Sequence, residues 1–297
     1  MDGKSESLAL IEELSRFGVL DLPTVRKLQT VLSGEFLSIR VGRGQEFWDV
    51  RPYQPLDDPI SSIDPHLSRR AGKLLTRIYR EEKELRIFLG VDISKTMSWG
   101  GPPYGKPALL LKSMALIGCA ALYQSNALGG FCIGLPETFR APSHERRALW
   151  ELVGETQKHL GCLERSEAWK IFPQLISLIG QPSVIFLLSD FLFDAESLRR
   201  HLALAISHEV MPVFIRSKFE RELPEVGRGD IADLDGEYAC SLNSRKPLAR
   251  KRFSDIAADQ EREAILAMRH VGITKLLRVC DPATIIEDLF YKTKIYS

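Results

Sequence analysis

Apolar and polar positions follow two different rhythms along the chain, and the change comes near residue 84. Beyond it, short apolar runs alternate with longer segments in which apolar residues recur at helical spacing. The runs predict strands at 87–91, 128–135, 183–188, 210–215 and 272–279, with a short edge strand at 138–142. The other segments predict helices at 107–123, 144–160, 167–179, 198–207 and 282–291. This alternation predicts an α/β fold, a mostly parallel sheet with helices on both faces.

Two domains are predicted, an N-terminal α+β segment at 1–83 and the α/β domain at 84–297. In the first, apolar spacing predicts two helices before residue 33, and β-favouring residues predict an extended, hairpin-like region at 36–50. In the second, residues 217–255 break the rhythm with charged residues, glycines and a proline. We expect an insertion of hairpins and loops there.

Asp64 followed by Pro65 predicts a helix start, because the acid caps the helix and proline fits its first turn. Basic residues follow, and we interpret them as a solvated face of that helix, with a partner-binding patch as the less favoured alternative. They are Arg69, Arg70, Lys73, Arg77 and Arg80.

The composition is that of an ordinary soluble protein, with 297 residues, 44% hydrophobic and 27% charged. Lys and Arg number 40 against 39 Asp and Glu, so no nucleic-acid or membrane-surface partner is expected. The start resembles no secretory signal, and no run approaches ~18 apolar residues, so no spanning helix is expected. The five cysteines form no C-x-x-C pair and the six histidines show no metal spacing. Reduced thiols and a cytoplasmic location are predicted.

Two of the predicted strands end on acids, Asp92 and Asp190. The carboxyl ends of parallel strands meet at one edge of the sheet, where ligands of open α/β sheets bind. Ser94 and Thr96 follow Asp92 at alternate positions, and carboxylates with hydroxyls suit a hard cation. The pattern therefore predicts a Mg²⁺ or Mn²⁺ site at Asp92, Ser94, Thr96 and Asp190. The alternative is a loop in which Asp92 and Ser94 satisfy local backbone amides.

The stretch DISKT at 92–96 resembles the DxSxS signature of von Willebrand factor A domains, which use it in their metal-ion-dependent adhesion site. From about residue 30 to 297, the chain is similar to bacterial domain-of-unknown-function family fifty-eight. These are von Willebrand A-like proteins often encoded beside MoxR-type ATPases. The closing SDF of that family appears at 189–191. Its upstream block is matched by Gly34, Gly42, Gly44, Phe47, Arg51, Tyr53, Pro55, Asp57, Asp58, Ile63, Asp64, Arg70, Gly72, Leu74 and Arg77.

The resemblance implies a von Willebrand A-like (Rossmann-like) fold for 84–297 and a further metal ligand from a second loop. The family's threonine there has no clear match. Ser166 stands at the right place and Thr156 is a second candidate, although Ser166 equally suits a helix N-cap.

The chain also departs from the family pattern. Thr96 replaces the last serine of DxSxS but keeps the hydroxyl. In the upstream block, Leu56 replaces a glycine, Pro65 replaces a tryptophan, and an arginine is missing near Ile60. The departures affect the upstream block more than the metal motif.

The expected function is metal-dependent protein binding without catalysis. Ser94 and Thr96 would be neutral ligands, so a divalent ion held there keeps charge for an acidic side chain of a partner. The resemblance suggests a MoxR-type AAA+ ATPase as that partner, in a chaperone-like role in complex assembly. The alternative is a Mg²⁺-dependent phosphohydrolase with Asp92 as nucleophile, although Ser94 stands where that motif carries its general acid.

A second motif is interpreted as a chance match. Residues 100–106 fit G-x-x-x-x-G-K of a phosphate-binding loop. The next residue is Pro107, which lacks both the hydroxyl for magnesium and an amide for the phosphates. Nucleotide binding is therefore not expected at Lys106. Trp99, which directly follows the metal motif, is expected to line the site.

Overall fold

In the computed structural model, the described residues are 46–55, 58, 60–80, 85–101, 104–192, 194–232, 239–290 and 294–295. They fall into two units, one within Leu32–Glu84 and the other within Leu85–Ser297. The helices predicted before residue 33, the turn glycines at 42 and 44, and Leu56 and Asp57 of the upstream block lie outside the described residues.

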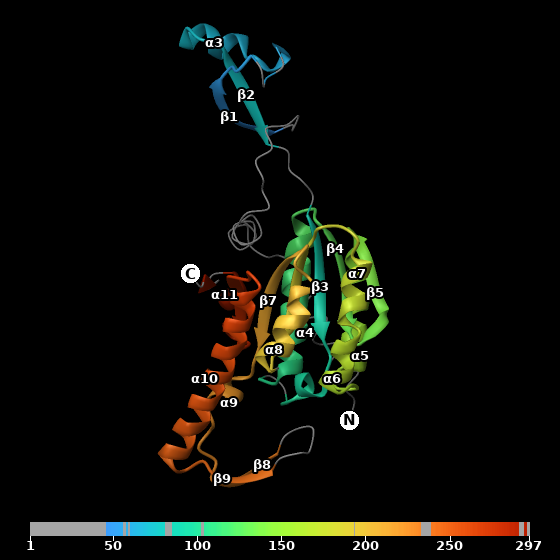
Figure 1. The fold of residues 1–297 in the computed structure, drawn as a ribbon, viewed down its shortest axis with the longest axis vertical. Coiled ribbons are helices and arrows are strands. Elements are labelled where there is room, and N and C mark those ends of the chain that lie inside the picture. The colour runs from blue at the N-terminus through green and yellow to red at the C-terminus, as the bar shows by residue number, and fades with distance from the viewer. Residues whose placement is uncertain are drawn as a thin grey trace. The chain divides into compact units, whose positions relative to one another are not determined.

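The smaller unit is built on an antiparallel hairpin (Figure 1). Strand β1 (Glu46–Pro52) pairs with β2 (Leu75–Arg80), and between them lie η1 (Ile60–Ser62) and α3 (Pro65–Ala71). The predicted helix start is confirmed, because the Asp64 carboxylate accepts hydrogen bonds from two backbone amides of the first turn, at 2.8 and 3.0 Å.

The predicted basic helix face is wrong beyond α3. Gly72 adopts φ 64 and ends the helix in the left-handed conformation, so the chain turns back as β2. Arg77 and Arg80 therefore lie on a strand. The sequence carries the signal, because Thr76, Ile78 and Tyr79 favour strands over helices.

The larger unit contains a seven-stranded sheet in the order β11-β10-β7-β6-β3-β4-β5 (Figure 1). Strands β3, β4, β6, β7 and β10 are parallel, and β5 and β11 add antiparallel edges. The predicted α/β fold with a mostly parallel sheet is thus confirmed. The strands are β3 (Arg86–Asp92), β4 (Ala127–Ile133), β5 (Leu135–Ser143), β6 (Val184–Ser189), β7 (Glu209–Ile215), β10 (Lys275–Val279) and β11 (Lys294–Ile295).

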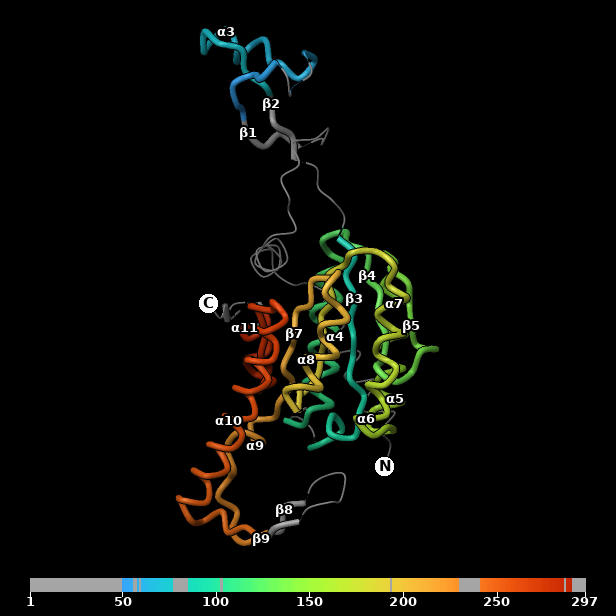
Figure 2. Tube along the Cα trace, viewed as in Figure 1, coloured from blue at the N-terminus to red at the C-terminus, as the bar shows by residue number. Residues whose placement is uncertain are grey.

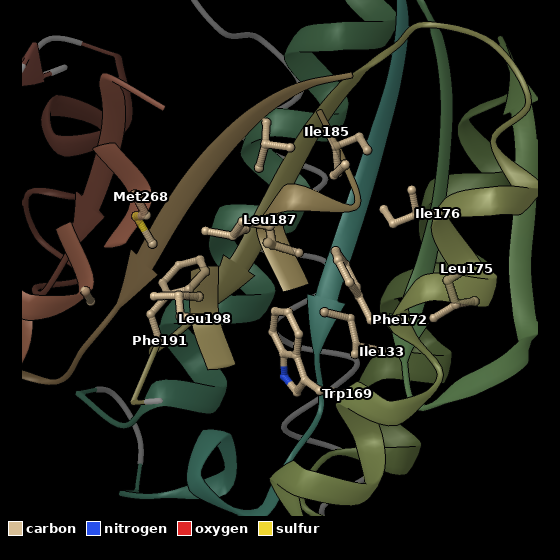
Figure 3. Close-up of a cluster of buried hydrophobic side chains, with 14 of the residues drawn as sticks. Ile133, Trp169, Phe172, Leu175, Ile176, Ile185, Leu187, Phe191, Leu198 and Met268 are labelled. Carbon is tan, nitrogen blue, oxygen red and sulfur yellow. The ribbon is translucent and has the colours of Figure 1, made fainter. Parts of the chain in front are cut away.

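Helices cover both faces of this sheet (Figure 1). Helices α4 and α5 pack on one face, and α6, α7, α8 and α10 pack on the other, where they bury the cluster of large apolar side chains in Figure 3. The helices are η2 (Lys95–Ser98), α4 (Lys106–Tyr123), α5 (Arg146–His159), α6 (Arg165–Lys170), α7 (Phe172–Leu178), α8 (Ala195–Ala203), α9 (Lys218–Arg221), α10 (Pro247–His270) and α11 (Ile285–Phe290).

Two predicted elements differ in the structure. The helix expected at 167–179 is two helices, because Pro173 lies in the first turn of a new helix that begins at Phe172. The first of the two begins at Arg165, with Glu164 as its N-cap residue. The insertion expected at 217–255 contains the hairpin of β8 (Arg228–Ala232) and β9 (Ala239–Asn243), but the long helix α10 already begins at Pro247. Figure 2 shows β7, α9 and α10 of this part of the chain as a continuous colour sequence from yellow-orange to red.

Helix α4 is long and apolar enough to cross a membrane by length and composition, which the apolar runs did not predict. In the structure, 67% of that window is buried. Its first residue, Lys106, is an ion-paired side chain inside the unit. Packing against the sheet and α5 accounts for its apolar composition, since a buried core helix passes the same test.

The end of α4 offers a stabilising substitution. Ser125 follows the helix with φ 57, and its amide donates to Leu122 O, so it holds the left-handed position that glycine prefers. We expect Ser125→Gly to raise the free energy of unfolding by about 0.5–1 kcal/mol, because it removes the Cβ strain of this conformation. Urea denaturation measures the change. Ser125→Ala is the control, since it keeps the Cβ, and an equal gain in both variants would contradict the explanation.

Candidate site at the carboxyl edge of the sheet

Asp92 is the last residue of β3 and is completely buried. One carboxylate oxygen accepts from the Ser94 amide at 2.9 Å. The other accepts from Trp169 Nε1 at 3.2 Å and from Ser189 Oγ at 2.7 Å. The carboxylate therefore joins β3 to the end of β6 and to α6. The alternative interpretation, in which Asp92 satisfies local backbone amides, holds for the bond from Ser94. The two other donors, Trp169 and Ser189, come from distant parts of the chain.

The two hydroxyls of the metal motif lie together in the loop after β3. Ser94 Oγ and Thr96 Oγ1 are 3.3 Å apart, and both residues are buried. The loop is held by the segment before α6, because the Lys95 amide donates to Leu163 O and the Gly161 amide donates to Ile93 O. These backbone bonds fix the side chains at the edge of the sheet.

Asp190 follows β6 and is also completely buried. Its Oδ1 accepts from the Leu192 amide at 3.2 Å, and its backbone carbonyl accepts from Arg216 Nε at 3.2 Å. The next residue, Phe191, adopts φ 50, a conformation that costs a non-glycine residue about 1–2 kcal/mol. Burial of its ring beside Phe214 helps to hold this turn.

Lys106, at the start of α4, is the main partner of Asp190. Its Nζ donates to Asp190 Oδ2 at 2.8 Å and to Thr96 O at 3.1 Å, and it lies 2.6 Å from Glu220 Oε1. The Lys106 side chain is 1% exposed. Lys106, the lysine of the motif that resembles a phosphate-binding loop, therefore forms a buried ion pair with Asp190. This contact is a physical reason to expect that Lys106 does not bind nucleotide phosphates.

Arg165, the first residue of α6, approaches from the other side. Its NH2 nitrogen donates to Thr96 Oγ1 and lies 3.2 and 3.3 Å from the two carboxylate oxygens of Asp190. Its NH1 nitrogen donates to Leu192 O. The side chain is 17% exposed, so this guanidinium is the cation of the cluster that reaches toward the surface.

The two cations determine the charge state of Asp190. Burial alone would raise the pKa of this carboxyl, but Lys106 and then Arg165 outweigh it and hold the pKa of Asp190 far below its usual range. Asp190 is therefore ionised at neutral pH and forms a buried salt-bridge network.

The predicted site residues converge only in part. Asp92, Ser94, Thr96 and Asp190 lie within one hydrogen-bonded cluster. Ser166 is exposed on α6 and is not the cap of that helix. The alternative Thr156 is buried on α5 against Cys132 Sγ, at 3.4 Å. Trp99, expected to line the site, is half-buried beside η2.

The cluster does not fit a divalent ion as it is arranged. The oxygens that would coordinate the metal at Asp190 and Thr96 already accept from Lys106 or Arg165. Among the described residues, no three His, Cys, Asp or Glu side chains gather in a way that could hold a metal. The Mg²⁺ or Mn²⁺ site stays a prediction, and these contacts give a physical reason to expect weak binding.

Sequence reasoning missed most partners of the two acids. Lys106 appeared only in the motif interpreted as a chance match, Ser189 appeared only in the SDF match, and Trp169 and Arg165 were given no role. Of these, Ser189 was the easiest to find, because it directly precedes Asp190 at the same strand end. The others come from different elements, and no local pattern marks them.

The sequence pattern of the family described as "Protein of unknown function DUF58" matches residues 49–263, more than half of the chain. The chain belongs to this family. The predicted membership of domain-of-unknown-function family fifty-eight is thereby confirmed, and the matched region of this DUF58 chain includes Asp92 and Asp190.

Relatives of this DUF58 chain are described as uncharacterised proteins. The "Uncharacterized protein Rv1480" of Mycobacterium tuberculosis (strain ATCC 25618 / H37Rv) is 26% identical over 258 residues, 85% of this chain and 80% of that protein. The "Uncharacterized protein Mb1516" of Mycobacterium bovis gives the same values, 26% over 258 residues with 85% and 80% coverage.

Two solved structures align with 69% of this chain. They are an aerotolerance-related membrane protein from Bacteroides fragilis NCTC 9343 and the conserved hypothetical protein BatB from Bacteroides thetaiotaomicron. Identities are 11% and 12%, the alignments cover 96% and 95% of those chains, and TM-scores are 0.33 and 0.32. Such low scores carry no argument about fold or function.

Proposed function

We propose that this DUF58 chain is a protein-binding module with a von Willebrand A-like domain that uses the carboxyl edge of its sheet. The partner is a protein that presents an acidic side chain, and the family resemblance favours a MoxR-type AAA+ ATPase in chaperone-like complex assembly. In this proposal the binding does not require a divalent ion, because Lys106 and Arg165 already pair with Asp190.

One observation carries the proposal, an exposed aromatic pair beside the strand-end cluster. Tyr104 and Phe219 are 42% and 39% exposed, and their rings meet edge to face with centroids 6.0 Å apart. Each directly flanks the buried ion pair, since Tyr104 lies two residues before Lys106 and Phe219 one residue before Glu220. Aromatic side chains are enriched at the centres of protein interfaces.

Two partly exposed basic side chains at this edge support an acidic contact from the partner. Arg165 is 17% exposed and Lys95 is 43% exposed, and within the chain they pair with Asp190 and Glu164. Cations at the rim of an interface mainly steer association and select the partner. An acidic segment that covers Tyr104 and Phe219 would meet these two side chains.

The alternative function, phosphohydrolysis by Asp92, has less support from the geometry. A nucleophilic carboxylate must present an oxygen to the substrate. Asp92 is 0% exposed, and its two oxygens accept from Ser94, Trp169 and Ser189. Its contacts suit a structural role within the cluster better than attack on a phosphate ester.

The proposal is tested by measuring the affinity for the purified MoxR-type ATPase of the same organism. We expect the double variant Tyr104→Ser with Phe219→Ser to bind at least about tenfold more weakly, since it removes two aromatic contacts of the interface. Interferometry in EDTA and in Mg²⁺ gives the affinities.

Tyr123→Ser is the matched control, because Tyr123 is 51% exposed at the C-terminal end of α4, whereas Tyr104 lies just before the start of that helix. It should bind like the wild type. Equal affinity of the double variant and the wild type, or no complex at all, would count against the proposed function.

A further inference from the structure

The strand-end site carries its own cations. We propose that the Lys106 ammonium and the Arg165 guanidinium take the place that the family resemblance assigns to a divalent ion, and that the site therefore does not bind Mg²⁺ or Mn²⁺. Both side chains contact the Asp190 carboxylate. They also hold Thr96 from two sides, Lys106 at its backbone oxygen and Arg165 at its hydroxyl.

The first argument is the supply of lone pairs. A hard cation needs several oxygen ligands with lone pairs directed at it. Asp190 Oδ2 accepts from Lys106 at 2.8 Å, and Arg165 NH2 lies 3.2 Å from Oδ1. Asp92 Oδ2 already accepts from two donors, Trp169 and Ser189. These carboxylate oxygens of Asp92 and Asp190 therefore already have donors within the chain.

The second argument is the balance of charge. Three carboxylates and three basic side chains meet in and beside the cluster, so their formal charges cancel. They are Asp92, Asp190, Glu220, Lys106, Arg165 and Arg216. A divalent ion would add two positive charges next to cations in a buried environment, where repulsion is weakly screened.

The two cations differ in their freedom to move aside. Lys106 is 1% exposed, and three oxygens surround its Nζ at 2.6, 2.8 and 3.1 Å. Arg165 is 17% exposed, so its side chain can be removed with less damage to the core. Arg165 is thus the residue whose charge should decide whether an ion can enter.

Mn²⁺ binding, followed by electron paramagnetic resonance on the full chain without a partner, tests this inference separately from the proposed function. Thr96→Val defines the background, since it lacks the hydroxyl expected to bind the metal. Above that background, the wild type should show no saturable binding up to about 1 mM Mn²⁺. Arg165→Ala should show saturable Mn²⁺ binding with a Kd below about 0.1 mM, at least about tenfold tighter than the wild-type limit, because one positive charge is gone.

Arg147→Ala is the matched control, since Arg147 is an 82% exposed arginine on α5. It should behave like the wild type. Saturable binding in the wild type that Mg²⁺ competes for and Thr96→Val abolishes would overturn the proposal. Failure of folded Arg165→Ala to gain affinity would overturn the role given to Arg165, and circular dichroism checks that the variant folds.

Discussion

Lys106→Met is expected to lower the free energy of unfolding by about 3–5 kcal/mol. The variant keeps an unbranched apolar side chain but removes the ammonium that faces Asp190 and Glu220. Asp190 stays completely buried and ionised. Of its two ion-pair partners, Lys106 and Arg165, only Arg165 remains. A buried charge that loses its closest partner is far more costly than a surface ion pair.

Urea denaturation at pH 7 measures this loss, and Lys112→Met is the matched control. Lys112 lies on the same helix and is only partly buried, so its variant should stay within about 1 kcal/mol of the wild type. The double variant Lys106→Met with Asp190→Asn should lose less than the sum of the two single variants, because the two residues form one contact. Strict additivity, or a Lys106→Met loss no larger than the control, would contradict the role of this ion pair.

Asp92→Ala is expected to lower the free energy of unfolding by about 3 kcal/mol or more. The sequence predicted Asp92 as a metal ligand, but its contacts in the structure are those of a buried hydrogen-bond acceptor. Its removal leaves three buried donors without their acceptor, the Ser94 amide, Trp169 Nε1 and Ser189 Oγ. Each unsatisfied buried donor costs about 1–3 kcal/mol. The variant is thus a poor test of metal binding, because lost stability and a lost ligand would occur together.

Thermal and urea denaturation give the size of the effect, and Asp194→Ala calibrates it. Asp194 is an exposed carboxylate that accepts from Ser197 N as the cap of α8, and loss of such a cap costs about 1 kcal/mol. A smaller loss for Asp92→Ala than for Asp194→Ala would show that the three donors find other partners.

The elements that the sequence predicted well are those with a strong local signal. The apolar runs that end on Asp92 and Asp190 became parallel strands β3 and β6, because a run too short for a helix and free of charges is stable only inside a sheet. Elements with a mixed signal were misread. Residues 75–80 carry arginines at helix-like spacing together with the strand-favouring Thr76, Ile78 and Tyr79, and they form strand β2, paired with β1.

The sequence by itself determined the α/β fold and the family. It also determined that Asp92, Ser94, Thr96 and Asp190 meet at one edge of the sheet, since the apolar runs show where the two strands end. Only the tertiary structure decided which groups surround these acids. Lys106 lies 84 positions from Asp190, and Arg165 lies 69 positions from Thr96. No periodicity extends over such separations, because these pairs form only when helices and strands pack together, and this packing is what brings Lys106 and Arg165 to Asp190.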